Sequence, residues 1–394
     1  MHYVRLLRLP SVEQASRNQY LSIVLTITTD LGDSFLSPAE PIDISVIAAY
    51  TALKDGQRVL LPLNLTPSNA PKWRAGMRAL KIDIAMPPQP IETVQIRPSN
   101  RQLTALGAFD IYPPRPAGQG LIVAAYADIP LPHKSPPFVC FRSLRLSSAE
   151  AAPGSVLQVE EDIGDSIARH IWDAGILTVS LIADMCLRTT TRATGAPLPA
   201  LAGVLRRQEG ALNILELGCG IGTLGVGIAR ILCVASSSKE GFTPPYVLMT
   251  DLPDAEERAR ANIARALGEP DPSADATPSI EYEDLDWEDG KDGVFGEKVQ
   301  ARPWDLIVLS DCTYNDMLPT LVKTLSALHA HSTAATAPCG TKILLSTKPR
   351  HPSERAFFGL MSDGGWVIEE KTVVPLAVLN GEAESVEIYL FAKK

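Results

Sequence analysis

The sequence predicts an α/β fold: a mostly parallel sheet with helices on both faces, preceded by a β-rich N-terminal domain. From Asn213 onward, short apolar runs alternate with helical patterns, which is typical of a parallel sheet whose crossovers are helices. Two strand-like runs, 366–374 and 384–391, predict an antiparallel hairpin at the end. The first 150 residues hold 17 of the 32 prolines, a density that breaks long helices. We therefore divide the 394 residues into two domains, 1–150 and 151–394.

The N-terminal domain shows short strand-like runs, several of them rich in β-branched residues. They lie at 21–28, 42–49, 57–65, 91–96, 120–127 and 138–146. These runs predict a small sandwich or a barrel-like sheet. One short helix is expected over 72–80, with Trp73 on its surface. No catalytic constellation is found here, so recognition of a partner or substrate is the expected role.

The second domain begins with a strand at 156–162 and a helical pattern from Ile163 to Leu187. Predicted strands then follow at 213–217, 246–250, 279–285, 305–309 and 342–347. Predicted helices lie between and after them, at 223–233, 253–267, 317–330 and 353–361. Polar stretches at 189–201, 236–245 and 268–278 read as loops.

A glycine loop follows the first of these parallel strands. Glycines stand at 218, 220 and 222, and Glu216 is the one acid of the preceding strand. Glycine lets the backbone turn sharply and lets a ligand approach closely, and the next helix aims its free N–H groups at that ligand. A dinucleotide-binding loop would need glycine at 223. Thr223 stands there instead, which disfavours a NAD-dependent oxidoreductase.

Ligands of such sheets bind at the carboxyl ends of the strands. Asp251 follows the second strand and offers two acceptor oxygens, enough for both hydroxyls of a ribose. A helix cap is the alternative role, for which Asp254 is better placed. Trp287 follows the third strand and either stacks on a base or packs in the core. Asp311 and Tyr314 follow the fourth strand and could line a channel for an amine.

Four pieces of the chain together resemble one family. They are Ile171-Trp172-Asp173-Ala174, the glycine loop with Glu216, Asp251, and Asp311-x-x-Tyr314. Residues from about 150 to 394 resemble the seven-strand, class I protein-lysine methyltransferases of non-histone substrates (methyltransferase-like 21 type), whose cofactor is S-adenosylmethionine (SAM). The resemblance implies a Rossmann-like fold and a protein substrate that presents a lysine. It also implies that Asp311 and Tyr314 shape the lysine site, and that SAM is contacted by Trp172, Gly218, Cys219, Gly220, Asp251, Trp287 and Ser310.

Two other functions remain open at this point. A methyltransferase of the same fold could act on a small molecule or on another side chain, and a non-catalytic protein could bind SAM as a scaffold. His170, beside Trp172, is expected on a helix surface rather than as a base. Lys348 and Arg350 follow the fifth strand and either contact substrate or are solvated.

The charge, hydropathy and cysteine content of the chain limit the kinds of partner that it is expected to bind. The net charge of −9 argues against a general nucleic-acid binder, and no run of about 18 apolar residues predicts a transmembrane helix. None of the six cysteines has zinc-ligand spacing, so no metal is expected. Reduced thiols favour the cytoplasm or the nucleus. The target lysine, the number of methyl groups and the oligomeric state are not determined by these patterns.

Overall fold

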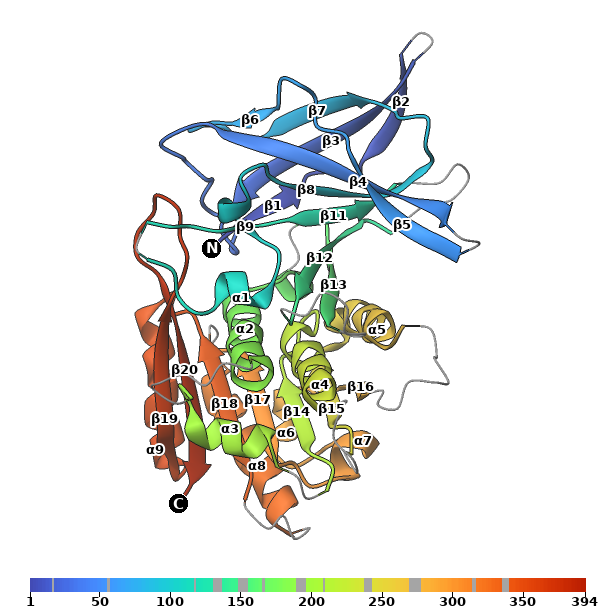
Figure 1. Ribbon diagram of the computed structural model, residues 1–394. Helices are drawn as coiled ribbons and strands as arrows, with labels where there is room; N and C mark the ends of the chain where they lie inside the picture. The colour runs from blue at the N-terminus through green and yellow to red at the C-terminus, as the bar shows by residue number, and fades with distance from the viewer. Residues whose placement is uncertain are drawn as a thin grey trace.

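The computed structural model describes three sheets and the helices that cover one of them (Figure 1). It describes the whole chain apart from residues 16–17, 55–56, 117, 130–136, 148–154, 165–166, 189–195, 208–209, 237–242, 269–277, 314–316 and 335–339. Parts of all three predicted loops therefore lie outside the described residues. No helix in the described ranges is long and apolar enough to cross a membrane.

Two sheets form the N-terminal half, and apolar side chains of both share one core. The first sheet has the order β2 (Ser11–Ala15), β3 (Asn18–Thr28), β1 (His2–Leu6), β10 (Ile122–Val123) and β9 (Thr104–Ala105), with β7 (Leu80–Ala85) beside β3. The second has the order β13 (Val156–Asp162), β12 (Val139–Arg145), β11 (Ala125–Asp128), β8 (Ile91–Pro98), β4 (Ile42–Lys54) and β5 (Gln57–Asn64), with β6 (Lys72–Trp73) beside β4. A 3₁₀ turn (η1, Arg101–Leu103) connects β8 of the second sheet to β9 of the first, and a short helix (α1, Ala108–Ile111) lies between β9 and β10. The arrangement is a sandwich, one of the two predicted forms.

The helix predicted over 72–80 is wrong. Lys72 and Trp73 form β6, and Leu80 begins β7. Gly76 lies between them with φ +80°, a left-handed conformation that interrupts any helix. The Trp73 side chain has no exposed surface, and its indole N–H donates to the Leu36 carbonyl at 2.8 Å.

The third sheet contains the predicted parallel strands. Its order is β16 (Ser279–Asp284), β15 (Tyr246–Asp251), β14 (Asn213–Leu217), β17 (Leu306–Ser310), β18 (Lys342–Thr347), β20 (Ser385–Lys393) and β19 (Trp366–Pro375). The first five strands run parallel, whereas β20 is antiparallel to both β18 and β19. The chain moves from β14 to β15 on one side and later to β17 on the other. The carboxyl end of β14 is therefore the switch point where such sheets bind ligands.

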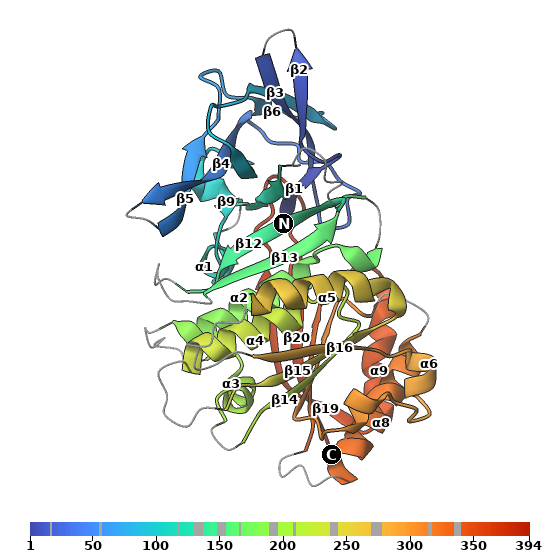
Figure 2. The ribbon, with the colours of Figure 1, turned by 90° about the vertical axis from the view of Figure 1, so that its right-hand side faces the viewer.

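Helices cover both faces of this sheet (Figure 2). On one face lie α2 (Asp173–Leu187), α3 (Pro199–Leu205), α4 (Thr223–Ser236) and α5 (Pro253–Leu267). On the other lie α6 (Trp287–Gly290), α7 (Glu297–Gln300), α8 (Leu318–Ala334) and α9 (Ala356–Asp363), the last preceded by the 3₁₀ turn η3 (Pro352–Arg355). Strand β14 shows why both faces need cover, because its side chains alternate between them. Ile214 packs toward α2–α5, and Leu215 and Leu217 pack toward α6–α9. Both strand faces are buried, which explains the near-continuous apolar runs.

The helical pattern from Ile163 was placed too early. Residues Ile167–Arg169 form a 3₁₀ turn (η2), and α2 begins at Asp173, with Trp172 as its N-cap residue. The segment before α2 is tied to β13 instead, because Glu161 accepts the Ile171 N–H at 3.0 Å. The His170 ring lies 2.6 Å from the Gly164 carbonyl and is 9% exposed. It is therefore buried, and its predicted place on a helix surface is wrong.

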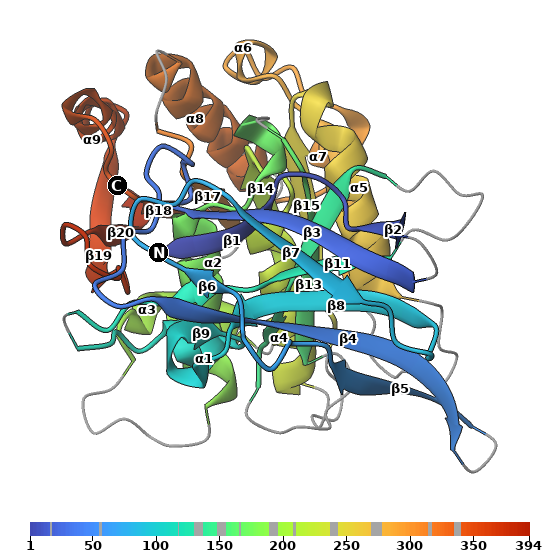
Figure 3. The same ribbon diagram turned by 90° about the horizontal axis from the view of Figure 1, so that it is seen from above.

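The N-terminal sandwich lies directly over helices α1, α2 and α4 (Figure 3). Tyr3, Leu144 and Leu157 belong to the same buried cluster as the apolar residues of α2 and α4. The Tyr3 hydroxyl donates to Asp173 at 2.7 Å, at the first turn of α2. Strand β13, which follows residue 150, pairs within the N-terminal sheet. The division of the chain at residue 150 stays a prediction.

Candidate active site

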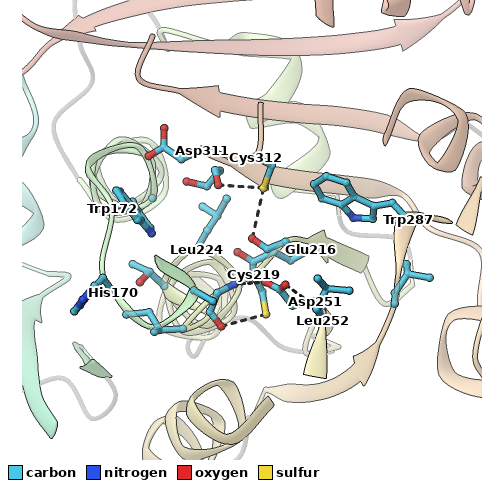
Figure 4. Close-up of a pocket in the computed structure, with 18 of the residues that line it drawn as sticks. His170, Trp172, Glu216, Cys219, Leu224, Asp251, Leu252, Trp287, Asp311 and Cys312 are labelled. Carbon is cyan, nitrogen blue, oxygen red and sulfur yellow. Dashed lines mark hydrogen bonds between the residues drawn. The ribbon is translucent and has the colours of Figure 1, made fainter. Parts of the chain in front are cut away.

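A cavity of about 300 Å³ opens at the carboxyl ends of β14, β15 and β17. Every residue that the sequence predicts for the site lines it, except Tyr314, which lies outside the described residues. Figure 4 shows Trp172 and Trp287 on opposite sides of this cavity, with Cys219 and Asp251 between them and Asp311 on the Trp172 side. The remaining lining residues are Leu31, Ala168, His170, Gly175, Glu216, Ile221, Thr223, Leu224, Leu252, Leu285, Asp286, Cys312, Met317 and Arg350, together with the predicted Gly218, Gly220 and Ser310.

The glycine loop forms a tight turn that only glycine accommodates. Gly218, Gly220 and Gly222 have φ values of +64°, +52° and +80°. A Cβ on Gly218 would lie 2.6 Å from the Cys312 sulfur, and one on Gly222 would lie 2.3 Å from Met249 Cε. The Cys219 N–H donates to the Thr250 carbonyl at 3.1 Å. The loop is thus pressed against its neighbours, and its backbone forms one wall of the cavity.

Glu216 is a cavity residue that the sequence analysis noted but did not assign to the site. It is 1% exposed, and its Oε2 accepts the Gly225 N–H of helix α4 at 3.0 Å. Burial raises the pKa of Glu216 to about 8, so the acid is mostly neutral at pH 7. The sequence feature that could have placed Glu216 in the site is that it is the single acid within a buried apolar strand.

The neutral state of Glu216 predicts a pH-dependent stability. Above the usual pKa of 4.5 the unfolded chain loses this proton, whereas the native state keeps it up to about pH 8. Native stability therefore falls as pH rises through this window, on the order of 1 kcal/mol per unit. We expect Glu216→Gln to melt increasingly higher than wild type between pH 5 and pH 8, with the difference constant above that. Differential scanning calorimetry measures it, and Glu382→Gln, at an exposed loop position, is the control. A pH-independent difference would contradict the neutral state.

Asp251 lies at the end of β15 and faces the glycine loop. Its Oδ2 accepts the Gly220 N–H at 2.7 Å, and its Oδ1 accepts the Leu252 N–H at 2.7 Å. Burial raises its pKa. Because a carboxylate oxygen accepts two hydrogen bonds, each oxygen retains a lone pair for a ligand. Leu252 is the N-cap residue of α5 and Asp254 is exposed in the first turn, so neither acid caps this helix.

Two tryptophans form opposite walls of the cavity. Trp172 is held at the start of α2, with the Arg350 guanidinium 5.2 Å from its ring centre. Trp287 begins α6, is partly buried and packs against the buried cluster on that face of the sheet. Their flat faces can bind the flat or apolar parts of a ligand.

Asp311 follows β17 in a left-handed conformation, with φ +53°. Its Oδ1 accepts the Lys348 N–H at 2.9 Å, and its Oδ2 accepts the Ala174 N–H at 3.2 Å. Burial raises the pKa of Asp311 to about 6, against the opposing charge of Arg350. At pH 7 this carboxylate is mostly ionised, and it borders the cavity with lone pairs to spare.

Two cationic residues, Lys348 and Arg350, lie near Asp311. The sequence left open whether they contact substrate or are solvated. Lys348 is 5% exposed, and its ammonium binds Asp30 and Asp173, each at 3.0 Å. It is therefore not solvated. Arg350 lines the cavity. Asp30 and Leu31 come from the N-terminal sandwich, and no local pattern in the sequence connects them with the site.

A buried hydroxyl of the cavity wall has no hydrogen-bond partner in the part of the chain that the structure describes. It belongs to Thr223, the first residue of helix α4. A buried hydroxyl without a hydrogen bond is costly. Its position beside the glycine loop indicates that a bound ligand provides the missing partner.

The chain is similar to a curated protein along most of its length and, more distantly, to solved methyltransferase structures. A UPF0665 family protein of Schizosaccharomyces pombe is 24% identical over 384 residues, which cover 96% of this chain and 98% of that protein. The SAM-dependent methyltransferase of Agrobacterium tumefaciens is 13% identical, with a TM-score of 0.37 over 67% of this chain and 72% of that one. Magnesium protoporphyrin IX methyltransferase of Synechocystis, with bound SAM, is 15% identical, with a TM-score of 0.31 over 50% of this chain and 74% of that one.

A family model described as "Lysine methyltransferase" matches residues 151–364, more than half of the chain. This range includes the glycine loop, Asp251 and Asp311. The strand order of the third sheet and the family match confirm the predicted class I methyltransferase fold, with its terminal hairpin and an additional β-rich N-terminal region. The chain belongs to the lysine methyltransferase family and is a methyltransferase whose cofactor is SAM.

Proposed function

We propose that this enzyme transfers the methyl group of SAM to the side-chain amine of a lysine in a non-histone protein. The observation that carries the proposal is Asp311, a buried carboxylate at the cavity wall whose two N–H donors leave lone pairs available. Such a group attracts and orients an amine. The family description supports lysine as the acceptor.

The residues around the cavity fit SAM. Asp251 would accept the two ribose hydroxyls, and the glycine backbone at 218–220 allows the donor to approach closely. The unpartnered hydroxyl of Thr223 would bind a polar group of the donor. Trp172 and Trp287 would pack against it from opposite sides, and Cys219 and Ser310 would complete the contacts.

SAM supplies an electrophilic methyl group on a positively charged sulfur. The neutral amine of lysine would attack this carbon, so that the N–C bond would form while the C–S bond breaks and leaves its electron pair on sulfur. Asp311 would orient the amine for in-line attack. A dedicated strong base is not required, because a dry channel next to a sulfonium charge already favours the neutral amine. Tyr314 would complete the channel.

The size of the cavity favours a slender acceptor. About 300 Å³ is at the small end for ligand pockets, so a bound SAM leaves little space for a second bulky molecule. A lysine side chain is long and unbranched, and the rest of its protein stays outside. Leu31 and Leu252, each about half exposed at 52% and 49%, lie at the cavity and would contact that protein.

A substitution at Gly218 tests the SAM site by shape alone. In Gly218→Ala the new Cβ would lie 2.6 Å from the Cys312 sulfur and 3.4 Å from Trp287, so the loop must shift. We expect SAM affinity, measured by isothermal titration calorimetry, to fall about tenfold or more because the binding groups are misplaced. Gly268→Ala is the control: its φ of +63° is also positive, but no atom lies within 4 Å of the added Cβ. Unchanged affinity in Gly218→Ala would exclude the loop from the SAM site.

The function is tested with the purified full chain, methyl-labelled SAM and a cell lysate. We expect label in a discrete protein band, and mass spectrometry of that band should find methyl-lysine. Label should be absent with Asp251→Ala. Label confined to small metabolites or nucleic acid, or methyl groups on another side chain, would refute the proposal. Mass spectrometry of a knockout proteome, searched for a lost methyl-lysine, gives the same answer in the cell.

A further inference from the structure

Asp30 belongs to the N-terminal sandwich but lies against the candidate active site. It follows strand β3 and is 2% exposed. The next residue, Leu31, lines the cavity. A buried carboxylate requires charged or hydrogen-bonding partners, and those of Asp30 come from far along the chain.

Three groups of the methyltransferase half bind the Asp30 carboxylate. The Lys348 ammonium donates to Oδ1 at 3.0 Å, and Arg350 Nη2 donates to Oδ2 at 2.7 Å. The Asp173 N–H, at the start of α2, donates to Oδ2 at 3.2 Å. Burial alone would raise the pKa of Asp30, but the hydrogen bond and charge of Arg350 and the charge of Lys348 lower it well below its usual range. Asp30 is therefore ionised at neutral pH.

The same elements also support Asp311. The backbone N–H of Lys348 and that of Ala174, one residue after Asp173, donate to the two Asp311 oxygens. Arg350 Nη2 lies 3.7 Å from Asp311 Oδ2, too far for a hydrogen bond, although the same atom lies 2.7 Å from Asp30. Two carboxylates thus compete for one guanidinium, and Asp30 holds it.

We propose that Asp30 is a positioning residue of the methyl-transfer site: it holds the Arg350 guanidinium away from Asp311 and so keeps the Asp311 carboxylate open to the acceptor amine. Without the Asp30 charge, Lys348 keeps Asp173 and Glu384, at 3.0 and 2.9 Å. Arg350 loses the acid that holds it, and Asp311 is the acid within reach. A guanidinium bound to Asp311 would occupy the place of the substrate amine and repel its positive charge. This inference rests on the proposed role of Asp311.

The test is a double-mutant cycle of Asp30→Asn and Arg350→Met in the full chain, assayed by methyl transfer to the protein that the wild-type enzyme labels. We expect Asp30→Asn to lower turnover about tenfold or more, and Arg350→Met added to it to restore most of that loss. Asp33→Asn is the matched control, because Asp33 lies in the same loop with an exposed carboxylate that accepts the Thr29 hydroxyl. Equal turnover in Asp30→Asn and wild type, or a double mutant slower than Asp30→Asn, would overturn the proposal.

A pH profile adds a readout that general destabilisation does not change. The charged or titratable groups that act on Asp311 are Arg350, Asp30 and Cys312. Asp30→Asn removes a negative neighbour and brings Arg350 closer, and both changes lower the pKa of Asp311. The acidic limb of the rate profile, expected near pH 6, should therefore move to lower pH in Asp30→Asn and back up in the double mutant. An unmoved limb contradicts the mechanism.

Two outcomes distinguish a failure of the proposed function from a failure of the proposed role of Asp30. If the wild-type enzyme labels no protein, the proposed function fails, whatever Asp30 does. If Asp30→Asn does not fold, the comparison of Asp30→Asn/Arg350→Met with Arg350→Met decides, because the double mutant removes one charge of each sign. Equal turnover in these two supports an action of Asp30 through Arg350, and a further loss in the double mutant refutes it.

Discussion

Asp251→Ala is expected to weaken SAM binding by about two to four orders of magnitude. The carboxylate would accept two ribose hydroxyls, and hydrogen bonds to a charged group contribute roughly 1.5–3 kcal/mol each. The substitution also removes the acceptor of the Gly220 N–H, 2.7 Å away, which loosens the glycine loop. Isothermal titration calorimetry with SAM measures the loss.

Two further variants help to assign the loss of SAM affinity to the Asp251 carboxylate. Asp251→Asn keeps one acceptor oxygen and should fall between wild type and Asp251→Ala. Asp254→Asn changes an exposed acid in the first turn of α5 and should bind SAM as wild type does. If Asp251→Ala retains wild-type affinity, the ribose assignment is wrong.

Asp311→Asn is expected to lower turnover about 100-fold, because the amine loses the charge that orients it for in-line attack. SAM affinity should change less than about threefold, since Asp311 is not proposed to touch the donor. Asparagine is the appropriate replacement, because φ at this position is +53° and asparagine tolerates the left-handed region. Asp311→Ala should be less stable than Asp311→Asn by about 1 kcal/mol from backbone strain. Single-turnover kinetics and thermal melts measure the two effects.

The pH dependence of Asp311→Asn identifies the group whose ionisation limits the rate at low pH. Asp311 has a pKa of about 6 and must be ionised to attract the amine, so the wild-type rate should fall as pH drops below 6. This limb should be absent in Asp311→Asn, whose amide does not titrate. A limb that persists in the variant assigns the titration to another residue, and normal turnover in Asp311→Asn would mean that another residue orients the amine.

Local patterns were sufficient to predict the methyltransferase sheet and to bring most of the predicted residues to one cavity. The period of apolar residues determines which segments become strands and helices, and the carboxyl ends of parallel strands necessarily meet at one edge. Gly218, Asp251, Trp287 and Asp311 could therefore be placed together from their positions in the sequence alone. Tyr314 stays a prediction.

The wrong helix over 72–80 has a local cause in Gly76, whereas other differences from the predictions arise from contacts between separate segments. The segment from 167 to 172 has helical spacing, but hydrogen bonds of His170 and Ile171 to Gly164 and Glu161 hold it outside α2. For Lys348 and Arg350 the sequence left contact with substrate and solvation open, because their partner Asp30 is more than 300 residues away in sequence. A pattern search along one stretch of chain has no access to such pairs.

The buried cluster that Tyr3, Leu144 and Leu157 share with α2 and α4 bears on how this protein can evolve. A gene fragment that encodes only the methyltransferase half would leave the outer side of α2 exposed to water, and the sandwich alone would expose the opposite surface. Exchange of either half for an unrelated one would require a new match across this whole apolar boundary. We therefore expect the two halves to be inherited together, with substitutions on the two sides of the boundary accepted in compensating pairs.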